Sequence, residues 1–398
     1  MTPAAGFWDF RNPMPLRVLI IPDKFKGTLR AETAAAALAK GWGRVRPEDT
    51  LDLLPMSDGG EGFGAIAGRL LGAKTQKTKT VDAAHRPCMA EWHWAPESKT
   101  AVIETARVVG LAMLPRGRFH PFALDSFGLG ALIEAGARKG ASKCLIGIGG
   151  SATNDAGFGL ARALGWTFLD RANEEITQWT GLARLEQIHA RGRRSWFKEL
   201  LVAVDVFNPL LGLRGATRVY GPQKGLQEEE FELAEGCLSR LASVVRRDLS
   251  RDLTQIAGAG AAGGLGFGLA AFAGARLESG FDLFSRFAGL EKRLGRADLV
   301  LTGEGAIDNS TAMGKGVGTI ARRCRRLRIP CIGLAGTLIP GPGLSLFTST
   351  YGLTDWTTSE TARKQAAHWV ERVASRIAED FTQKPITQTK RFSTKVFP

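Results

Sequence analysis

The sequence predicts an α/β protein of two domains, built around a mostly parallel, Rossmann-like sheet. Short apolar runs alternate along the chain with segments in which apolar residues recur at helical spacing. Most of these runs are followed at once by a glycine-rich or polar loop, as expected at the carboxyl ends of parallel strands. The 398 residues provide enough chain for two domains.

Composition places the chain among ordinary globular proteins, with 44% apolar and 23% charged residues. The basic residues behind the net charge of +14 are scattered along the sequence, so we interpret them as an anion-attracting surface rather than a nucleic-acid interface. The five cysteines lack C-x-x-C spacing, which predicts that they are reduced residues of the core. The uncharged segment 256–275 is rich in glycine and alanine, which favours a ligand loop and a buried helix over a membrane span. We therefore expect a cytoplasmic protein without a nucleic-acid or membrane partner.

The first two strands are predicted over 16–21 and 51–56, with a helix over 30–42 between them. Ligands of open α/β sheets bind beyond the carboxyl ends of strands. The loop after the first strand places three charged residues there, namely Asp23, Lys24 and Lys26. The loop after the second strand, 57–62, carries Asp58 and Glu61, a pair that suits Mg²⁺ or a general base but also suits a simple helix cap.

The pattern changes between 74 and 104, where polar and apolar residues alternate in three short runs. This alternation predicts partly antiparallel strands and a domain boundary near Thr80. Further strands, each followed by a polar or glycine loop, are predicted over 201–206, 298–301 and 330–334. The tail after Thr382 has basic residues and no acid, which predicts disorder.

The stretch 143–157 is the strongest single signal for a ligand site. An apolar run precedes Gly149, Gly150, Ser151, Asn154 and Asp155, and helical spacing resumes at Ala156. Glycines allow backbone N–H groups to approach an anion closely, and a helix N-terminus adds partial positive charge.

A dinucleotide site is an alternative interpretation of this stretch. Gly147, Gly149 and Ala152 fit the G-x-G-x-x-A fingerprint, and Asp170 stands about where a ribose-binding acid is expected. An NAD-dependent oxidoreductase using residues 147–152 therefore remains open, as does a ligand-binding regulator without catalysis.

The number of glycine loops, most of which carry an acid or a lysine, exceeds what one dinucleotide fold needs. No Walker A motif, zinc-ligand spacing or G-x-S-x-G elbow is present. Phosphoryl transfer needs cations, backbone donors and an acid that orients the attacking hydroxyl, and the loops supply these groups.

In these loops the chain resembles the class I glycerate kinases, the bacterial glycerate 2-kinase type. The matching stretches fall in order between about residues 16 and 356, and they are 22–29, 57–62, 146–155, 205–210, 221–225, 258–264 and 301–308. The resemblance implies two α/β domains, one inserted into the other, with the active site in the cleft between them. It also implies ATP and Mg²⁺ as cofactors, D-glycerate as the acceptor and 2-phosphoglycerate as the product.

Domain limits and roles follow as hypotheses. We place the Rossmann-like domain at 1–80 and 290–382, the inserted α/β domain at 81–289, and a disordered basic tail at 383–398, with a homodimer as a possible assembly. We predict that Asp205 or Asp155 orients or deprotonates the acceptor hydroxyl, and that Asp58 and Glu304 hold Mg²⁺. Phosphate groups and the substrate carboxylate are assigned to catalytic Lys24 and to Asp23, Lys26, Gly59, Gly60, Gly149, Gly150, Ser151, Asn154, Lys224, Gly263 and Gly264.

Overall fold

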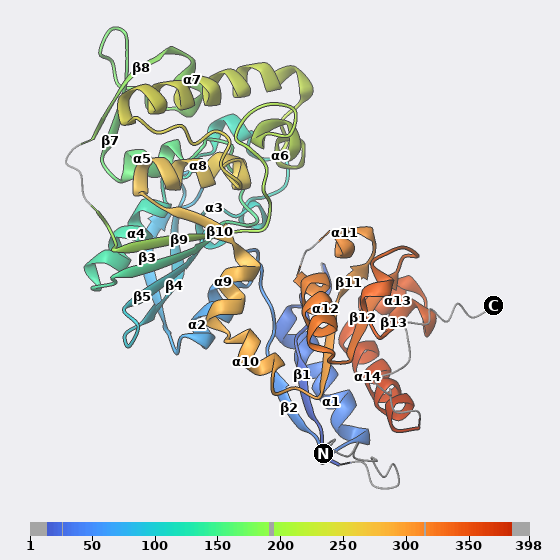
Figure 1. Ribbon diagram of the computed structural model, residues 1–398. Helices are drawn as coiled ribbons and strands as arrows, with labels where there is room; N and C mark the ends of the chain where they lie inside the picture. The colour runs from blue at the N-terminus through green and yellow to red at the C-terminus, as the bar shows by residue number, and fades with distance from the viewer. Residues whose placement is uncertain (1–13, 26, 191–194, 314–315, 384–398) are drawn as a thin grey trace, which may run out of the picture. The chain divides into compact units, whose positions relative to one another are not determined.

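The chain forms two compact α/β units (Figure 1). The computed structural model describes residues 14–25, 27–190, 195–313 and 316–383. Unit 1 combines 1–56 with 288–398, and unit 2 comprises 57–287. Unit 2 is therefore inserted in sequence after the second strand of unit 1, and the predicted fold class is confirmed.

The first boundary between the units differs from the one expected near Thr80. The strand β3 (Lys74–Val81) pairs along its whole length with β4 (Pro87–Ala95), from Lys74 opposite Trp94 to Val81 opposite Pro87. Because β3 is hydrogen-bonded into the sheet of unit 2, the chain enters unit 2 at Ser57. The change of pattern at residue 74 marks a change from helix to antiparallel strand inside one unit.

Unit 1 contains, in its described residues, a five-stranded parallel sheet in the order β13-β12-β11-β1-β2. Its strands are β1 (Arg17–Ile20), β2 (Thr50–Leu53), β11 (Leu299–Ile307), β12 (Cys331–Leu338) and β13 (Ser349–Gly352). Its helices are α1 (Ala31–Val45), α10 (Leu290–Leu294), α11 (Asn309–Ala312), α12 (Gly316–Leu327), α13 (Ser359–Lys364) and α14 (Ala366–Gln383).

Helices α1 and α14 pack together over one face of this sheet. Leu38 and Trp42 of α1 share a core with Val370 and Val373 of α14 and with Ile20 of β1. The two helices approach closely at Gly41, where a Cβ atom would lie 2.1 Å from the carbonyl oxygen of Glu371. Both helices pack on alternate residues of the strands. This packing explains why segment 30–42, whose pattern predicts an amphipathic helix, forms one.

Unit 2 contains, in its described residues, a six-stranded mixed sheet in the order β10-β9-β6-β5-β4-β3 and a separate β7–β8 pair. Its other strands are β5 (Thr100–Glu104), β6 (Lys143–Gly147), β7 (Trp166–Asp170), β8 (Leu185–Ala190), β9 (Glu199–Val204) and β10 (Arg276–Ser279). Its helices are α2 (Phe63–Leu70), α3 (Ala106–Val109), α4 (Leu129–Arg138), α5 (Phe158–Ala163), α6 (Ala216–Lys224), α7 (Phe231–Leu249), α8 (Ala261–Ala273) and α9 (Gly280–Phe287).

The buried helix α8 connects the layers of unit 2. Leu265 and Leu269 face the sheet and α4, whereas Phe267 faces a second core that includes α7. Figure 1 shows α8 between the sheet and α7, and helices α2 and α9 contribute to a smaller core on the sheet with Phe63 and Leu283. The uncharged segment 256–275 therefore ends in a core helix, as predicted.

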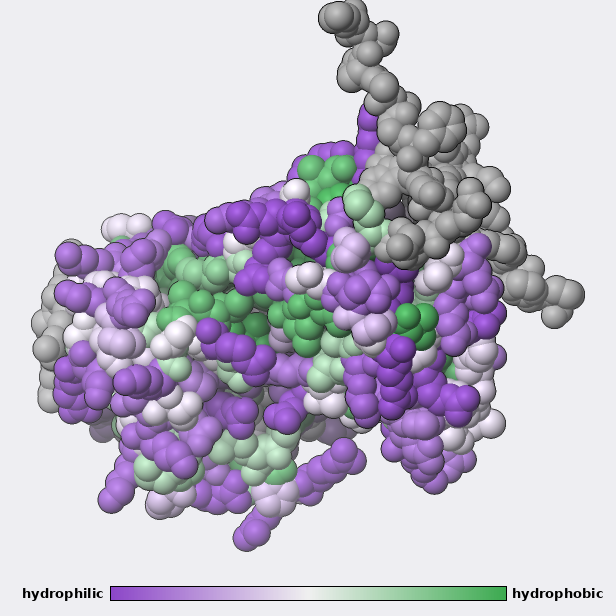
Figure 2. All heavy atoms as spheres, turned by 90° about the horizontal axis from the view of Figure 1, so that it is seen from below, coloured by the Kyte–Doolittle hydropathy of each residue, from purple (hydrophilic) through white to green (hydrophobic). Residues whose placement is uncertain are grey.

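The surface is largely hydrophilic on the face drawn in Figure 2, with hydrophobic side chains in patches among the polar ones. Among the described residues, none of the helices combines the length and the apolar character that crossing a bilayer requires.

Candidate active site

The parallel strands β5, β6 and β9 of unit 2 end at one edge of the sheet, and most of the predicted site residues lie in the loops there. Glu104, Gly147 and Val204 are the last residues of these strands. The loop 57–62 joins the same edge, because its Gly59 lies against Ala203 of β9. The carboxyl edge of a parallel sheet is the usual place for a ligand site in α/β folds.

Loops 57–62 and 147–150 are packed backbone against backbone. A Cβ atom at Gly149 would lie 2.6 Å from the Cα of Gly60, and one at Gly59 would lie 2.9 Å from the carbonyl oxygen of Ala203. The Gly149 N–H donates to the Gly59 carbonyl at 3.3 Å, and the Gly60 N–H donates to Asp58 Oδ1 at 3.4 Å. These glycines are therefore required for close approach of the two loops.

Ser151 is buried and engaged within its own turn. Its Oγ accepts the Thr153 N–H at 3.1 Å and lies 3.0 Å from the Thr153 hydroxyl. The turn is tied to α3 by the Ala152 N–H donating to Val109 and by the Leu111 N–H donating to Gly150. These contacts give the loop a defined shape.

Asp155 is fully buried, and its carboxylate holds neighbouring elements together. Oδ2 accepts the N–H and hydroxyl of Ser126 at 2.9 and 2.7 Å and the N–H of Gly159 at 2.9 Å, while Oδ1 accepts the N–H of Gly157 at 3.2 Å. Burial, with a contribution from nearby Asp125, raises the pKa of Asp155 against the lowering effect of these hydrogen bonds. The helix α5 begins at Phe158, later than the resumption predicted at Ala156, because Asp155 first orders the turn.

Lys224, at the end of α6, is buried rather than exposed to solvent. Its Nζ donates to the Thr153 carbonyl at 2.6 Å, and 7% of the residue is exposed. Burial lowers the pKa of Lys224 to about 7, although the charge of Asp155 acts in the opposite direction. An ammonium in this environment loses its proton far more readily than a solvated lysine does.

Asn154 and the glycines of α8 surround this lysine. Asn154 Nδ2 donates to the Thr217 hydroxyl at 3.2 Å, and within the described residues its Oδ1 has no hydrogen-bond partner. Residues 262–264 have left-handed backbone, and a Cβ atom at Gly263 would lie 1.9 Å from the Thr153 carbonyl oxygen. Glycine is thus required at 263 by both its dihedral angles and its neighbours.

Asp205 follows β9 and is exposed, beside a residue that sequence analysis did not select, Tyr220. Burial and the negative charge of Asp205 raise the pKa of Tyr220 to about 12. The Tyr220 hydroxyl donates to Asn208 Oδ1 at 2.6 Å. Thr217, Tyr220 and Lys224 lie on one face of α6, and their i, i+3, i+7 spacing with the predicted Lys224 is the signal that would have identified Thr217 and Tyr220.

Glu104 was also missed, although a carboxylate at a strand end is a recognisable signal. It is 4% exposed, and its Oε1 and Oε2 accept the N–H groups of Gly62 and Gly64 at 3.2 and 2.9 Å. Glu104 therefore stabilises the first turn of α2 and fixes the loop that carries Asp58.

The dinucleotide fingerprint does not form the geometry that NAD binding requires. Ten residues separate the end of β6 at Gly147 from the start of α5 at Phe158, so the turn does not lead directly into a helix. Gly147 instead packs against the Phe63 ring. Asp170 accepts the N–H groups of Ala172 and Glu174 in a turn, which gives it a structural role.

In unit 1, three predicted residues lie on or just after the neighbouring strands β1 and β11. The strand order corresponds to 2-1-3-4-5 when the strands of this unit are numbered alone, and the order reverses between β1 and β11. Asp23, just after β1, donates its N–H to Gly303, while Lys24 donates its N–H to Asp23 Oδ1 at 2.7 Å. Glu304 Oε1 accepts the Thr311 hydroxyl at 2.9 Å.

Glu304 lies on a strand and not in the loop that the sequence predicted. The strand β11 continues to Ile307 because Glu304 and its neighbours pair with β12, with Glu304 opposite Ala335. Lys26, another predicted phosphate ligand, lies outside the described residues.

The predicted metal ligands, Asp58 and Glu304, belong to different units. Across the described residues, no group of three or more His, Cys, Asp or Glu side chains is arranged to hold a metal. Mg²⁺ at phosphoryl-transfer sites is commonly held by one or two carboxylates together with substrate phosphates and water. Asp58 and Glu304 each carry carboxylate oxygens, which is the donor type that such binding uses.

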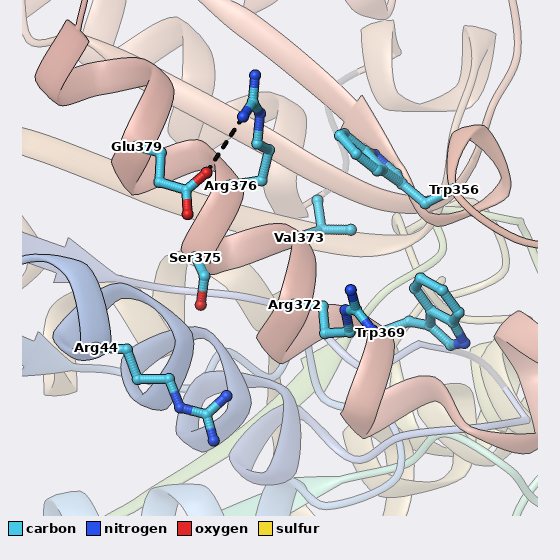
Figure 3. A pocket seen from close by; sticks show the side chains of 8 residues that line it. All are labelled: Arg44, Trp356, Trp369, Arg372, Val373, Ser375, Arg376 and Glu379. Atoms are coloured by element: carbon cyan, nitrogen blue, oxygen red, sulfur yellow. Dashed lines mark hydrogen bonds and ion pairs between the residues drawn. The ribbon is translucent and has the colours of Figure 1, made fainter.

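A separate surface cavity of about 300 Å³ in unit 1 contains none of the predicted residues (Figure 3). It is lined by Arg44, Trp356, Trp369, Arg372, Val373, Ser375, Arg376 and Glu379. Arg44 pairs with Glu371 at 2.5 Å, Arg376 pairs with Glu379 at 3.2 Å, and Arg372 lies 5.5 Å from the centre of the Trp369 ring. Arg44 thus joins α1 to α14, whereas Arg372 and Arg376 make contacts within α14.

Comparison with known proteins identifies the family. The Glycerate kinase of Bacillus subtilis is 36% identical over 378 residues, which cover 91% of this chain and 97% of that protein. The Glycerate 2-kinase of Escherichia coli is 37% identical over 336 residues, covering 83% and 87%. The crystal structure of a putative glycerate kinase 2 from Salmonella typhimurium matches with a TM-score of 0.80 and 34% identity, covering 93% and 99%. A sequence model described as the glycerate kinase family matches residues 18–382. The chain belongs to the glycerate kinase family, as its motifs predicted.

Proposed function

We propose that this enzyme transfers the γ-phosphate of ATP, in the presence of Mg²⁺, to the 2-hydroxyl of D-glycerate and forms 2-phosphoglycerate. Family membership over almost the whole chain is the observation that carries this proposal. The choice of the 2-hydroxyl is supported by the name of the Escherichia coli relative, Glycerate 2-kinase.

Asp205 is the better of the two acids for orienting or deprotonating the acceptor hydroxyl. It is exposed at the carboxyl edge of the sheet, where a substrate can reach it. Asp155 is fully buried, and its oxygens already accept hydrogen bonds from Ser126, Gly157 and Gly159. A general base must come within hydrogen-bond reach of the proton it takes. We therefore assign Asp205 to the reaction and Asp155 to the positioning of the loop.

Backbone and cationic groups would supply the remaining stabilisation of the transferring phosphoryl group. Phosphoryl transfer depends mainly on positioning and on charge neutralisation. Asp58 and Glu304 would hold Mg²⁺, which supplies positive charge to the phosphate oxygens when it is bound. Asp23 and Lys24 lie where the sheet order of unit 1 reverses, a usual ligand position in doubly wound folds.

The test is ADP release by the purified protein with ATP, Mg²⁺ and D-glycerate. ADP that forms only with metal and D-glycerate supports the kinase, with EDTA and L-glycerate as controls. Phosphorus NMR of the product then distinguishes 2- from 3-phosphoglycerate. A folded sample that binds ATP but releases no ADP with D-glycerate would refute the proposed acceptor.

A further inference from the structure

Arg107 lies on α3, which is attached to the glycine loop of the candidate site. The Thr105 N–H donates to the Gly147 carbonyl, and the Ala152 N–H donates to Val109 at the other end of α3. Gly150 also approaches the Ala106 side chain, since a Cβ at Gly150 would lie 3.6 Å from the Ala106 Cβ. Arg107 is thus fixed at the carboxyl edge of the sheet by the backbone on both sides of it.

The guanidinium of Arg107 has weak charge compensation. Its side chain is 53% exposed, and its Nε lies 3.8 Å from Glu104 Oε1. Both oxygens of Glu104 already accept backbone N–H groups, from Gly62 and Gly64. An exposed ion pair at this distance contributes little. Within the described residues, neither Asp58 nor Glu61 forms an ion pair with Arg107.

Lys224 is one of the lysines that were predicted to neutralise phosphate and the substrate carboxylate, and it is poorly suited to binding a carboxylate. Lys224 is buried, donates to the Thr153 carbonyl and has a pKa near 7. An arginine remains charged at every working pH and offers a planar fork of donors that matches a carboxylate. The fork of Arg107 lies near loop 57–62, because Glu104 Oε1, which is 3.8 Å from the Arg107 Nε, also accepts the Gly62 N–H.

We infer that Arg107 is a specificity-determining residue that binds the carboxylate of the acceptor. This inference rests on the proposed function, because it takes a hydroxy acid as the acceptor. A phosphate of the nucleotide has related chemistry, so the experiment separates the two anions. Charge-assisted hydrogen bonds typically contribute enough that their loss weakens binding by about 10- to 100-fold.

The experiment compares steady-state kinetics of the wild type with Arg107→Met and Arg107→Lys. We expect Arg107→Met to raise KM for D-glycerate by about 10-fold or more, with KM for ATP changed less than about 2-fold. Arg107→Lys should recover part of the loss, because it keeps the charge but not the fork. Arg138→Met, on α4 and also exposed, is the matched control and should behave as the wild type.

Two results would overturn the inference: an unchanged KM for D-glycerate in Arg107→Met, or a rise confined to KM for ATP. Calorimetric titration of D-glycerate into each protein, saturated with Mg²⁺ and a non-hydrolysable ATP analogue, separates this inference from the proposed reaction. If the wild type binds D-glycerate without turning it over, the proposed reaction fails, whereas weaker binding to Arg107→Met still supports the carboxylate site. If D-glycerate does not bind the wild type, the carboxylate site fails as well.

Discussion

At the scale of single residues, the structure gives acidic and basic residues with similar sequence contexts very different environments. Asp155 and Asp205 both lie in loops that follow buried strands, but Asp155 is enclosed by hydrogen-bond donors and Asp205 is exposed. Lys224 was predicted to meet phosphate, yet it is buried against a carbonyl. Sequence patterns predict where charged residues occur along the chain, but burial and hydrogen-bond partners depend on contacts between distant segments.

Substitution of the two aspartates should have different consequences. We expect Asp205→Asn to lower kcat by about 100-fold or more, with nucleotide affinity nearly unchanged, because the acceptor hydroxyl loses its proton acceptor. Asp155→Asn should instead lower the free energy of unfolding by about 1–3 kcal/mol, since an amide group cannot accept from all the same donors. Turnover assays, nucleotide titration and urea unfolding measure these effects. Near-normal kcat in Asp205→Asn would exclude Asp205 as the base.

The buried Lys224 should make stability depend on pH. Its pKa is about 7 in the folded protein against an ordinary value of 10.5, so between these values the unfolded chain binds more protons. The free energy of unfolding should therefore gain up to about 1.4 kcal/mol per pH unit from this residue as pH rises through that window. We expect Lys224→Met to lack this rise in urea unfolding at a series of pH values.

An exposed lysine provides the control for this comparison. Lys77 on β3 is 62% exposed, so Lys77→Met should leave the pH dependence as it is in the wild type. Equal pH dependence in the wild type and Lys224→Met would show that the Lys224 ammonium is solvated.

At the scale of elements, apolar runs with a following loop predicted β1, β6 and β9 and the helix α1 within a few residues. The end of β11 was predicted as a loop because Thr302–Asp308 is rich in glycine and polar residues. Pairing with β12 extends the strand through this segment, and such pairing involves residues far away in sequence. The strand β8, which pairs with β7, lies in the polar region 171–200 that shows little periodicity, so it could not be predicted.

The contact between α1 and α14 gives a prediction at this scale. A side chain at Gly41 would lie 2.1 Å from the Glu371 carbonyl oxygen and 2.7 Å from the Ala374 Cβ. We expect Gly41→Ala to lower the free energy of unfolding by about 2 kcal/mol, as overpacking of a close helix contact typically does. Chemical denaturation measures the change.

Gly43 on the same helix is the matched control. A Cβ there meets nothing nearer than Leu51 at 4.0 Å. Gly43→Ala should therefore raise stability by roughly 0.5–1 kcal/mol, because alanine restricts the unfolded chain and favours helix. A similar effect of both substitutions would show that α1 and α14 do not pack as closely as described.

At the scale of the whole molecule, four hydrophobic cores formed by described residues each draw their buried side chains from a single unit. The cores around the mixed sheet, α7 and α9 use residues of 57–287, and the core around α1 and α14 uses the other two segments. The sequence predicted two domains and the insertion by resemblance, but not the boundary at Ser57. In the sequence, the change from helical to alternating spacing at residue 74 was more conspicuous than the connection between β2 and α2, where the boundary lies.

We expect the segment 57–287, produced alone, to fold cooperatively, because its sheet and cores are internal to it. It should release no ADP from ATP and D-glycerate, since it lacks Asp23, Lys24 and Glu304. Circular dichroism during urea unfolding and the ADP assay test both statements. Turnover by this fragment would show that unit 1 is dispensable for the reaction.

The insertion also has a consequence for the time course of biosynthesis. The strand β1 pairs with β2, made soon after it, and with β11, and Arg17 donates to Asp298, which is 281 positions later. At ~5–20 residues per second, a ribosome needs roughly 15–60 s to supply that partner. During this interval unit 2 can be completed while the apolar β1 has β2 beside it but still lacks β11 on its other edge, so we expect the emerging N-terminal segment to need protection by a chaperone.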